Sequence, residues 1–387
     1  MAFKNAPRRR SARGAGNGGS QQGMMPASTS YSPQKQPAQQ YSRYSAAYQG
    51  GAKASGGRKR WVVLGIVLLL VTALVVAGTY AFVFLQNVNN NLKGSYTETQ
   101  LANIQEQLVP VTDVNEPFYV MLIGSDERAD SDEMGARSDS NIVVRIDPVN
   151  WVVTMVSIPR DTLITFNGSQ IKFNAAYAYG DGAAGTIKAA SALCNVKISH
   201  YAEINFDGVV SLVDSIGGVE VDVPQPIDDP QAGDVTIDQA GLQTLNGAQA
   251  LVFARSRHYY TDGDFSRSAN QRALIEAIVD KVFSLPATQI PQAVQEMSKC
   301  VSTDMDVSAI YSLAMQYVNS GKEMTIYSIM APSTTEEIDG GSYVVVNETE
   351  LAQVMAAVDA GKDPNDVPTT SVTSGTFIHY DYVEGYD

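Results

Sequence analysis

The chain has 387 residues, enough for one large domain or two ordinary ones with tails. Its formal net charge of −14 averages two unlike regions, because residues 1–60 carry eleven Lys or Arg and no acidic residue. The rest of the chain sets sixteen basic residues against all forty-one acidic ones. We therefore expect no nucleic-acid partner for this acidic portion.

Residues 1–60 consist largely of Gly, Ser, Gln, Ala, Pro and Tyr. They lack apolar periodicity and cannot bury a core, so we expect a disordered basic tail in the cytoplasm that contacts anionic membrane lipid. A phosphorylated tail, or one that docks on a partner, is the alternative.

Residues 61–85 form a run of twenty-five residues without a charge. At about 1.5 Å per residue, a helix of this length spans a hydrocarbon core of roughly 30 Å. A cleaved signal peptide has a shorter apolar core near the very N-terminus, whereas sixty residues come first here. We predict an uncleaved signal-anchor in the cell membrane, with the N-terminus cytoplasmic and residues 86–387 outside.

The two cysteines, Cys194 and Cys300, both lie in the portion predicted to be outside the cell. That compartment permits a disulfide, and a pair with no third thiol is compatible with one. We favour pairing, although the sequence alone does not bring the two thiols together.

The chain after the anchor alternates strand and helix patterns, following a polar segment at 86–115 that we predict to be a stalk. Strands are predicted at 118–123, 141–146, 152–158, 201–205, 219–223, 325–329 and 343–346. Helices are predicted at 183–193, 206–216, 247–254, 266–285, 290–299, 307–317 and 349–360. The alternation predicts one α/β or α+β domain over residues 116–360, with a loose tail at 361–387.

All eight arginines of the acidic portion fall in two windows, residues 128–160 and 255–272, whereas its eight lysines are scattered. Arginine is favoured where a planar guanidinium holds carboxylate or phosphate through two hydrogen bonds. Two such windows in an acidic domain indicate one anion-binding site built from two segments. Arginines that pair with surface acids are the alternative.

The predicted helix at 266–285 sharpens this interpretation. Its apolar residues form one stripe, and Arg267 and Gln271 lie on the same stripe, one turn apart near the N-terminus. Polar side chains on a buried face need partners or a ligand. The opening turns of a helix also favour an anion, so a phosphate or pyrophosphate would satisfy both requirements.

Two carboxylates flank neighbouring predicted strands. Asp126 follows the strand at 118–123, and Asp139 immediately precedes the strand at 141–146. Such a pair could hold Mg²⁺, which prefers oxygen ligands and would offset phosphate charge. Two loop acids facing water are the alternative. Arg160 and Asp161 end the third strand and bring a further Arg and acid to the same sheet edge.

A Gly-x-Gly-x-x-Gly sequence at 180–185 leads into a predicted helix. Because it follows a short Tyr-rich segment instead of a first strand, we interpret it as a glycine-rich helix start and not as a dinucleotide site. The three histidines are too scattered for a zinc motif.

Nine short motifs in order resemble the LytR-CpsA-Psr family of bacterial cell-envelope proteins. They include Gly124-Ser-Asp126-Glu-Arg128, Arg137-Ser-Asp139, Ile158-Pro-Arg160-Asp161, Arg255-Ser-Arg257 and Gly263-Asp264-Phe-Ser-Arg267 with Gln271 and Arg272. The resemblance runs from about residue 118 to 285 and includes the membrane anchor upstream. Ser140 stands where the family commonly has Thr, and residues 129–135 look like an insertion that could alter the pocket rim.

The resemblance implies a single extracellular α/β domain with a central mixed sheet flanked by helices, preceded by one transmembrane helix. It also implies a long apolar pocket for a polyprenyl tail. The implied activity is Mg²⁺-dependent transfer of a glycopolymer from a polyprenyl-pyrophosphate carrier to an acceptor hydroxyl, usually on peptidoglycan, with a glycoprotein as the other possible acceptor.

Roles carry over residue by residue. Asp126 and Asp139 would hold the metal, and Arg160, Asp161 and Asp264 are the catalytic candidates. The implied pyrophosphate-binding residues are Arg137, Arg160, Arg255, Arg257, Arg267 and Gln271. Two alternatives use the same residues: a pyrophosphatase with water as acceptor, and a non-catalytic scaffold that binds the lipid-linked glycan.

Overall fold

The computed structural model describes residues 56–113, 115–125, 137–257, 260, 263–286 and 288–373, with side chains from Leu64 onward. The chain forms two compact units, Met1–Ile66 and Val67–Asp387. All the strands in the described part of the chain belong to the second unit. Its centre is a six-stranded sheet in the order β10-β3-β2-β1-β6-β9. These strands are β1 (Phe118–Ser125), β2 (Ser138–Asp147), β3 (Val152–Ser157), β6 (Ile198–Asn205), β9 (Val301–Thr303) and β10 (Thr325–Met330).

The sheet is mixed. Strand β1 pairs antiparallel with β2 and parallel with β6, while β3 pairs antiparallel with β2 and parallel with β10. Strand β9 closes one edge, antiparallel to β6. The predicted fold class, an α/β domain with a central mixed sheet flanked by helices, is confirmed.

Strand β1 explains why the sheet needs helices on both faces. Tyr119, Met121 and Ile123 belong to one core cluster, and Phe118 and Val120 belong to another. Successive side chains of a strand point to opposite faces, so a continuous apolar run requires a cover on each face.

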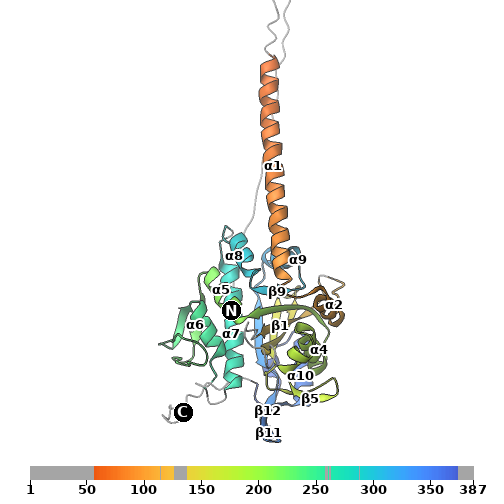
Figure 1. The fold of residues 1–387 in the computed structure, drawn as a ribbon, viewed down its shortest axis with the longest axis vertical. Helices are drawn as coiled ribbons and strands as arrows, with labels where there is room; N and C mark the ends of the chain where they lie inside the picture. The colour runs from red at the N-terminus through yellow and green to blue at the C-terminus, as the bar shows by residue number, and fades with distance from the viewer. Residues whose placement is uncertain are drawn as a thin grey trace, which may run out of the picture. The chain divides into compact units, whose positions relative to one another are not determined.

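The helices supply these covers (Figure 1). One face packs against α2 (Glu98–Gln107), α3 (Ala175–Tyr179), α4 (Ala183–Cys194) and α10 (Glu348–Asp359). The other face packs against α7 (Asp264–Ser284) and α9 (Val307–Ser320), with α5 (Phe206–Ser215), α6 (Gly247–Arg255) and α8 (Ile290–Met297) in the adjoining layer.

The glycine-rich segment at 180–185 begins α4, as predicted. Gly182 has a φ of +72°, a conformation that glycine adopts without strain. A Cβ on Gly185 would lie 2.6 Å from the Cα of Gly180, so only glycine permits this close turn. At α6, Asn246 caps the helix through a reciprocal capping box with Gln249.

Three two-stranded hairpins lie outside the central sheet: β4 (Leu163–Phe166) with β5 (Ser169–Lys172), β7 (Val219–Val223) with β8 (Gly241–Leu245), and β11 (Ser333–Ile338) with β12 (Gly341–Val346). The predicted strands at 219–223 and 343–346 are confirmed as β7 and β12, of which β7 alternates valine with acidic residues. The other four strands were not predicted from the sequence. A 3-10 turn, η1 (Pro364–Asp366), follows α10.

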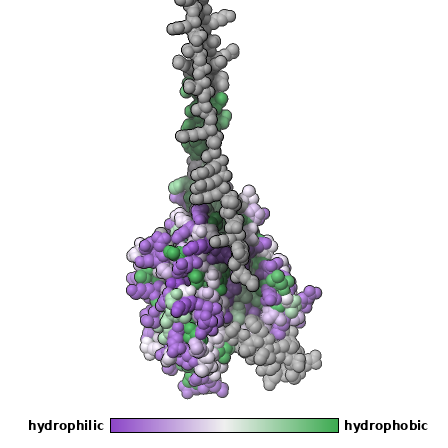
Figure 2. Space-filling view, turned by 180° about the vertical axis from the view of Figure 1, so that it is seen from behind, coloured by the Kyte–Doolittle hydropathy of each residue, from purple (hydrophilic) through white to green (hydrophobic). Residues whose placement is uncertain are grey.

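The first helix, α1 (Gly56–Leu92), contains a stretch long and apolar enough to cross a membrane, Leu64–Leu92. Its apolar side chains are exposed, Leu74 by 73%, and they form the hydrophobic surface visible on this helix (Figure 2). Such exposure suits lipid and not water. The α1 helix is therefore a candidate membrane span.

The segment after the apolar run, predicted to be a stalk, contributes buried side chains. Val88 and Leu92 of α1 pack with Val307 of α9. Thr97 begins α2 with a capping box, and Ile104 of α2 is 1% exposed in the main core cluster.

The preferred pairing of the cysteines is wrong. Cys194 is a free, buried thiol on α4, and Cys300 is a free, partly buried thiol between α8 and β9. The two residues lie in different layers of the domain, and burial raises the pKa of the Cys194 thiol to about 12.

Candidate active site

Arg160 joins the two arginine windows that the sequence singled out. It follows β3 after Ile158, whose backbone N–H donates to Asn141 of β2 at 2.7 Å. Its Nη1 donates to Asp139 Oδ1 at 2.8 Å, and its Nε lies 3.8 Å from Asp264 Oδ1 on α7. The guanidinium therefore bridges the start of β2 and the start of α7.

Asp264 and Arg267 occupy the first turn of α7. Arg267 Nη2 lies 2.5 Å from Asp264 Oδ1, and both side chains are largely buried. Within the described part of the chain, Asp264 Oδ2 and the Nε atoms of Arg160 and Arg267 are buried without a hydrogen-bond partner. Buried polar groups are normally satisfied, so these atoms indicate a site built to receive a ligand.

The two buried arginines of this cluster, Arg160 and Arg267, have pKa values shifted in opposite directions. Burial lowers the pKa of Arg267, and the charges of Arg160 and Arg257 lower it further, against the opposing effect of Asp264 and Asp139. Burial also lowers the pKa of Arg160. The negative charges of Asp139, Asp264 and Asp161 outweigh this effect and raise the pKa of Arg160. An anionic ligand would therefore stabilise the charged form of Arg267.

Asp161 belongs to the same cluster through its neighbours. It lies 3.7 Å from Arg160 Nε, and its Oδ1 is 2.9 Å from Nζ of Lys172, the last residue of β5. The backbone N–H of Val344 in β12 donates to the Asp161 carbonyl at 3.0 Å. Lys172 was not predicted as a site residue, because the β4–β5 hairpin that brings it here has no clear sequence pattern.

The other three arginines of the second window, Arg255, Arg257 and Arg272, each contact a different part of the domain. The Arg257 charge acts on Arg267, and its side chain lies beside Gly263 at the start of α7. Arg255 lies over the Phe206 ring at 4.4 Å and donates to the Ala232 carbonyl at 3.2 Å. Arg272 points elsewhere, to Ser328 at 2.7 Å and to Ser157, and ties α7 to the sheet.

The first window is described only in part. Arg137 is half-buried two residues before Asp139, and Asp126 lies outside the described residues. Within the described part of the chain, no three acidic, His or Cys side chains come together as a metal site. Asp139 and the unsatisfied Asp264 carboxylate nevertheless supply the oxygen ligands that Mg²⁺ prefers.

An apolar cavity of about 270 Å³ adjoins the cluster, between the sheet and helices α5, α6 and α7. Its walls are mainly aliphatic, with Leu274, Ile275 and Ile278 contributed by α7. Ser140, Arg255 and Gln271 also line it. Ser140 directly follows Asp139 and Gln271 lies one helical turn after Arg267, so the polar lining residues are next in the chain to two members of the Arg–Asp cluster.

Gln271 itself donates to the Ala254 carbonyl at 3.3 Å, which fixes its amide in the cavity wall. Arginine-rich and apolar surfaces that lie close together are the two features with which a protein can bind an amphiphilic anion, such as a lipid phosphate.

The chain belongs to the LytR_cpsA_psr family, whose family model matches residues 80–360. The resemblance seen in the sequence is thereby confirmed, and it extends beyond residue 285. Among curated relatives, the chain is 30% identical to "Biofilm regulatory protein A" of Streptococcus mutans, over 75% of this chain and 74% of the relative. It is 32% identical to "Polyisoprenyl-teichoic acid--peptidoglycan teichoic acid transferase TagU" of Enterococcus faecalis, over 78% of this chain and 96% of the relative.

Among solved structures, "TagT bound to LIIa-WTA" is similar with a TM-score of 0.55 and 25% identity. The match covers 66% of this chain and 94% of that chain. The relatives named as transferases support the predicted enzyme class, a transferase of this family.

Proposed function

We propose that this protein transfers a glycopolymer from a polyprenyl-pyrophosphate carrier to an acceptor hydroxyl, most readily on peptidoglycan, during cell-wall assembly. The observation that carries the proposal is the buried Arg160–Asp264–Arg267 cluster at the polar end of the apolar cavity. A lipid pyrophosphate has a charged head and an apolar tail. The cluster suits the charged head, and the cavity suits the apolar tail. The transferase names of relatives such as TagU agree with this chemistry.

The arginines would bind the pyrophosphate. Arg267 is buried with an unpartnered Nε, and Arg160 has the same feature. Arg137 and Arg257 would extend the phosphate contacts, and Arg255 and Gln271 would border the point where the lipid enters the cavity. Charge that develops on the phosphoryl oxygens would be stabilised by groups already in position.

The transfer step requires a base. Asp264 or Asp161 would accept the proton of the acceptor hydroxyl, whose oxygen attacks the phosphorus next to the sugar. The bond from that phosphorus to the bridging oxygen breaks, and polyprenyl phosphate leaves. Both carboxylates contact a cation, Asp264 at 2.5 Å from Arg267 Nη2 and Asp161 at 2.9 Å from Lys172 Nζ, so both are candidates for the base.

Asp126 and Asp139 would hold Mg²⁺. The ion would supply further positive charge for the pyrophosphate oxygens. Arg160 Nη1 donates to Asp139 at 2.8 Å and keeps this carboxylate oriented.

The proposal includes a location and a division of the chain. Residues 1–60 would be a cytoplasmic tail, 61–85 a single membrane span, 86–115 the connection to the domain, and 116–360 the catalytic domain outside the cell, followed by a tail at 361–387. The candidate span in α1 supports an anchor in the membrane that carries the donor lipid.

The test is transfer of a radiolabelled lipid-linked glycan to purified cell-wall glycan by the full-length protein in lipid nanodiscs. Arg267→Ala should lower the transfer rate by about 100-fold or more. Lys322→Ala, which removes an exposed cation that donates to the Val149 carbonyl at 2.7 Å, serves as the control and should retain full activity. Full activity of Arg267→Ala would contradict the proposal.

Product analysis separates transfer from hydrolysis. A transferase yields labelled glycan bound to the wall acceptor, whereas a pyrophosphatase releases soluble glycan phosphate whether or not the acceptor is present. A scaffold without catalysis would bind the donor and yield neither product.

A further inference from the structure

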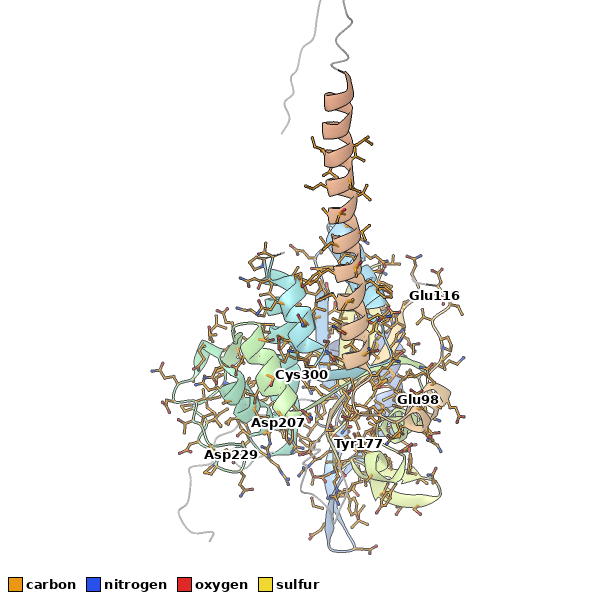
Figure 3. All side chains as sticks on the ribbon, turned by 45° about the horizontal axis from the view of Figure 1, so that its top comes forward. Glu98, Glu116, Tyr177, Asp207, Asp229 and Cys300 are labelled. Carbon is orange, nitrogen blue, oxygen red and sulfur yellow. The ribbon has the colours of Figure 1, made fainter. Side chains whose placement is uncertain are left out.

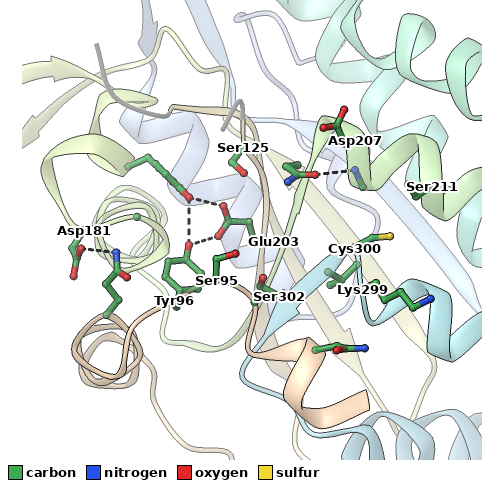
Figure 4. A pocket seen from close by; sticks show the side chains of 18 of the residues that line it. Ser95, Tyr96, Ser125, Asp181, Glu203, Asp207, Ser211, Lys299, Cys300 and Ser302 are labelled. Atoms are coloured by element: carbon green, nitrogen blue, oxygen red, sulfur yellow. Dashed lines mark hydrogen bonds between the residues drawn. The ribbon is translucent and has the colours of Figure 1, made fainter. Parts of the chain in front are cut away.

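A polar cavity of about 640 Å³ takes no part in the site described above. Five segments of the chain line it, including the α1–α2 connection, the ends of β1 and β6, and the α3–α4 turn (Figure 4). Tyr177, Asp207 and Cys300, which all line this cavity, come from three different elements (Figure 3).

One wall of this cavity is fixed by hydrogen bonds. Glu203 of β6 is 6% exposed and accepts from Tyr177 Oη at 2.6 Å and from Tyr96 Oη (Figure 4). Asp181 accepts from Asn103 at 2.8 Å and from Gln100 at 3.2 Å. The aromatic and carboxylate groups of this wall are therefore held in position before any ligand arrives.

The end of β1 also reaches this cavity, because Ser125, the last residue of the strand, belongs to the lining and is 1% exposed.

The charge of the lining identifies the class of ligand. Asp181, Glu203, Asp207 and Glu296 are acidic, and the basic side chain in the lining is Lys299. This excess of carboxylates repels phosphate-rich polymers and opposes a role as an extension of the donor site. Hydroxyl, amide and carboxylate groups, with tyrosine rings, suit the alternating hydroxyls and apolar faces of a neutral saccharide.

The position of the cavity relates it to the reaction. Glu203 and Val301 line both the polar and the apolar cavity, and the consecutive residues Gly124 and Ser125 line one each. Ser125 also pairs with Ser138, the residue before Asp139. The polar cavity therefore extends to the same sheet edge as the Arg–Asp cluster.

We propose that the polar cavity binds neutral sugar units of the acceptor glycan and orients its hydroxyl toward the cluster. This assignment rests on the proposed function. It separates the two substrates by charge, with the anionic donor at the arginines and the neutral acceptor at the carboxylates.

Equilibrium binding tests the proposal without requiring donor or turnover. The full-length protein in nanodiscs is titrated with a neutral tetrasaccharide of N-acetylglucosamine and, separately, with an anionic glycerol-phosphate oligomer. Ligand-observed NMR measures binding, and empty nanodiscs provide the control for signal that arises from the lipid. The tetrasaccharide should bind. The anionic oligomer should not compete with it.

Two variants locate the binding. Asp207→Asn, an exposed carboxylate of the lining, should weaken tetrasaccharide binding about tenfold. Ser211→Trp should fill the cavity and abolish binding. The matched controls, Asp222→Asn on β7 and Ser312→Trp on α9, lie outside the lining and should bind as the unaltered protein does.

Two outcomes would overturn the assignment: no tetrasaccharide binding by the unaltered protein, or unchanged binding by both cavity variants with their folds intact by circular dichroism. Saccharide binding without any glycan transfer would instead refute the proposed function and leave the saccharide site standing. In the transfer assay, Asp207→Asn should raise the KM for acceptor and leave the KM for donor unchanged.

Discussion

Arg160 Nη1 and Asp139 Oδ1 are 2.8 Å apart, although twenty-one residues separate them in the chain. The antiparallel β2–β3 pair accounts for this contact, because it places the start of β2 beside the end of β3. Asp264, from the first turn of α7, completes a cluster of three chain segments around one guanidinium. The candidate site depends on that convergence.

The Arg160→Lys variant tests whether the planar guanidinium is required. Lysine keeps the positive charge, but one compact ammonium cannot face Asp139, Asp264 and a phosphate at once. We expect kcat/KM for transfer to fall at least about tenfold, with little change in Tm because Arg160 is partly exposed. The conservative Lys172→Arg variant shows whether exchanging a different cation of the cluster also lowers kcat/KM. Activity of Arg160→Lys equal to that of the unaltered protein would show that charge alone suffices.

Asp264 and Arg267 should be strongly coupled in stability. The Asp264→Asn variant leaves Arg267 buried without its nearest countercharge, and loss of one member of a buried ion pair costs about 3–5 kcal/mol. The double variant Asp264→Asn/Arg267→Met removes both charges and should recover part of that loss. Denaturant unfolding of all four proteins in the double-mutant cycle measures the coupling. Strictly additive effects would show that the pair does not act as a unit.

The apolar cavity should be required for lipid retention. In Val279→Trp, an indole replaces a side chain of the cavity wall on α7 and reduces the space for an apolar chain. We expect less lipid to co-purify and the KM for donor to rise. Val318→Trp, on the exposed side of α9, introduces the same ring outside the cavity. Mass spectrometry of extracted lipid compares the two, and equal lipid content would count against the cavity as the lipid site.

Glu350 should make part of the stability depend on acid pH. It accepts hydrogen bonds from the Thr370 hydroxyl at 2.6 Å, from the Thr370 N–H and from the Ser371 N–H, and these lower its pKa from 4.5 to about 2. A carboxyl with a lowered folded-state pKa contributes stability that is complete above about pH 4.5 and is lost as the pH falls toward 2.

The Glu350→Gln variant should therefore be less stable than the unaltered protein at neutral pH, and the difference should shrink between pH 4.5 and 2. Thermal unfolding of the two proteins across this window measures the difference. Glu348→Gln, exposed in the same helical turn, provides the control. A stability difference that stays constant with pH would show that Glu350 acts through packing alone.

Much of the fold was predictable because its strongest elements have local causes. The β1 run and the apolar stripe of α7 each follow from the side chains of a short stretch of residues. The glycines at 180–185 and Asn246 likewise mark helix starts by their own chemistry. Strands β4, β5, β8 and β11 depend on neighbours for their stability, so their sequence patterns are weak.

The sequence by itself determined the composition of the site: an acidic domain after an apolar run, with its arginines confined to two windows and acids among them. Only the tertiary structure decided which of these residues act together. It places Arg160, Asp264 and Arg267 in one cluster, directs Arg272 to Ser157 and Ser328, and adds Lys172 from a hairpin. The reason is physical: side-chain type is a local property, whereas partners and burial depend on how distant segments pack. The same packing creates both cavities, which no local pattern encodes.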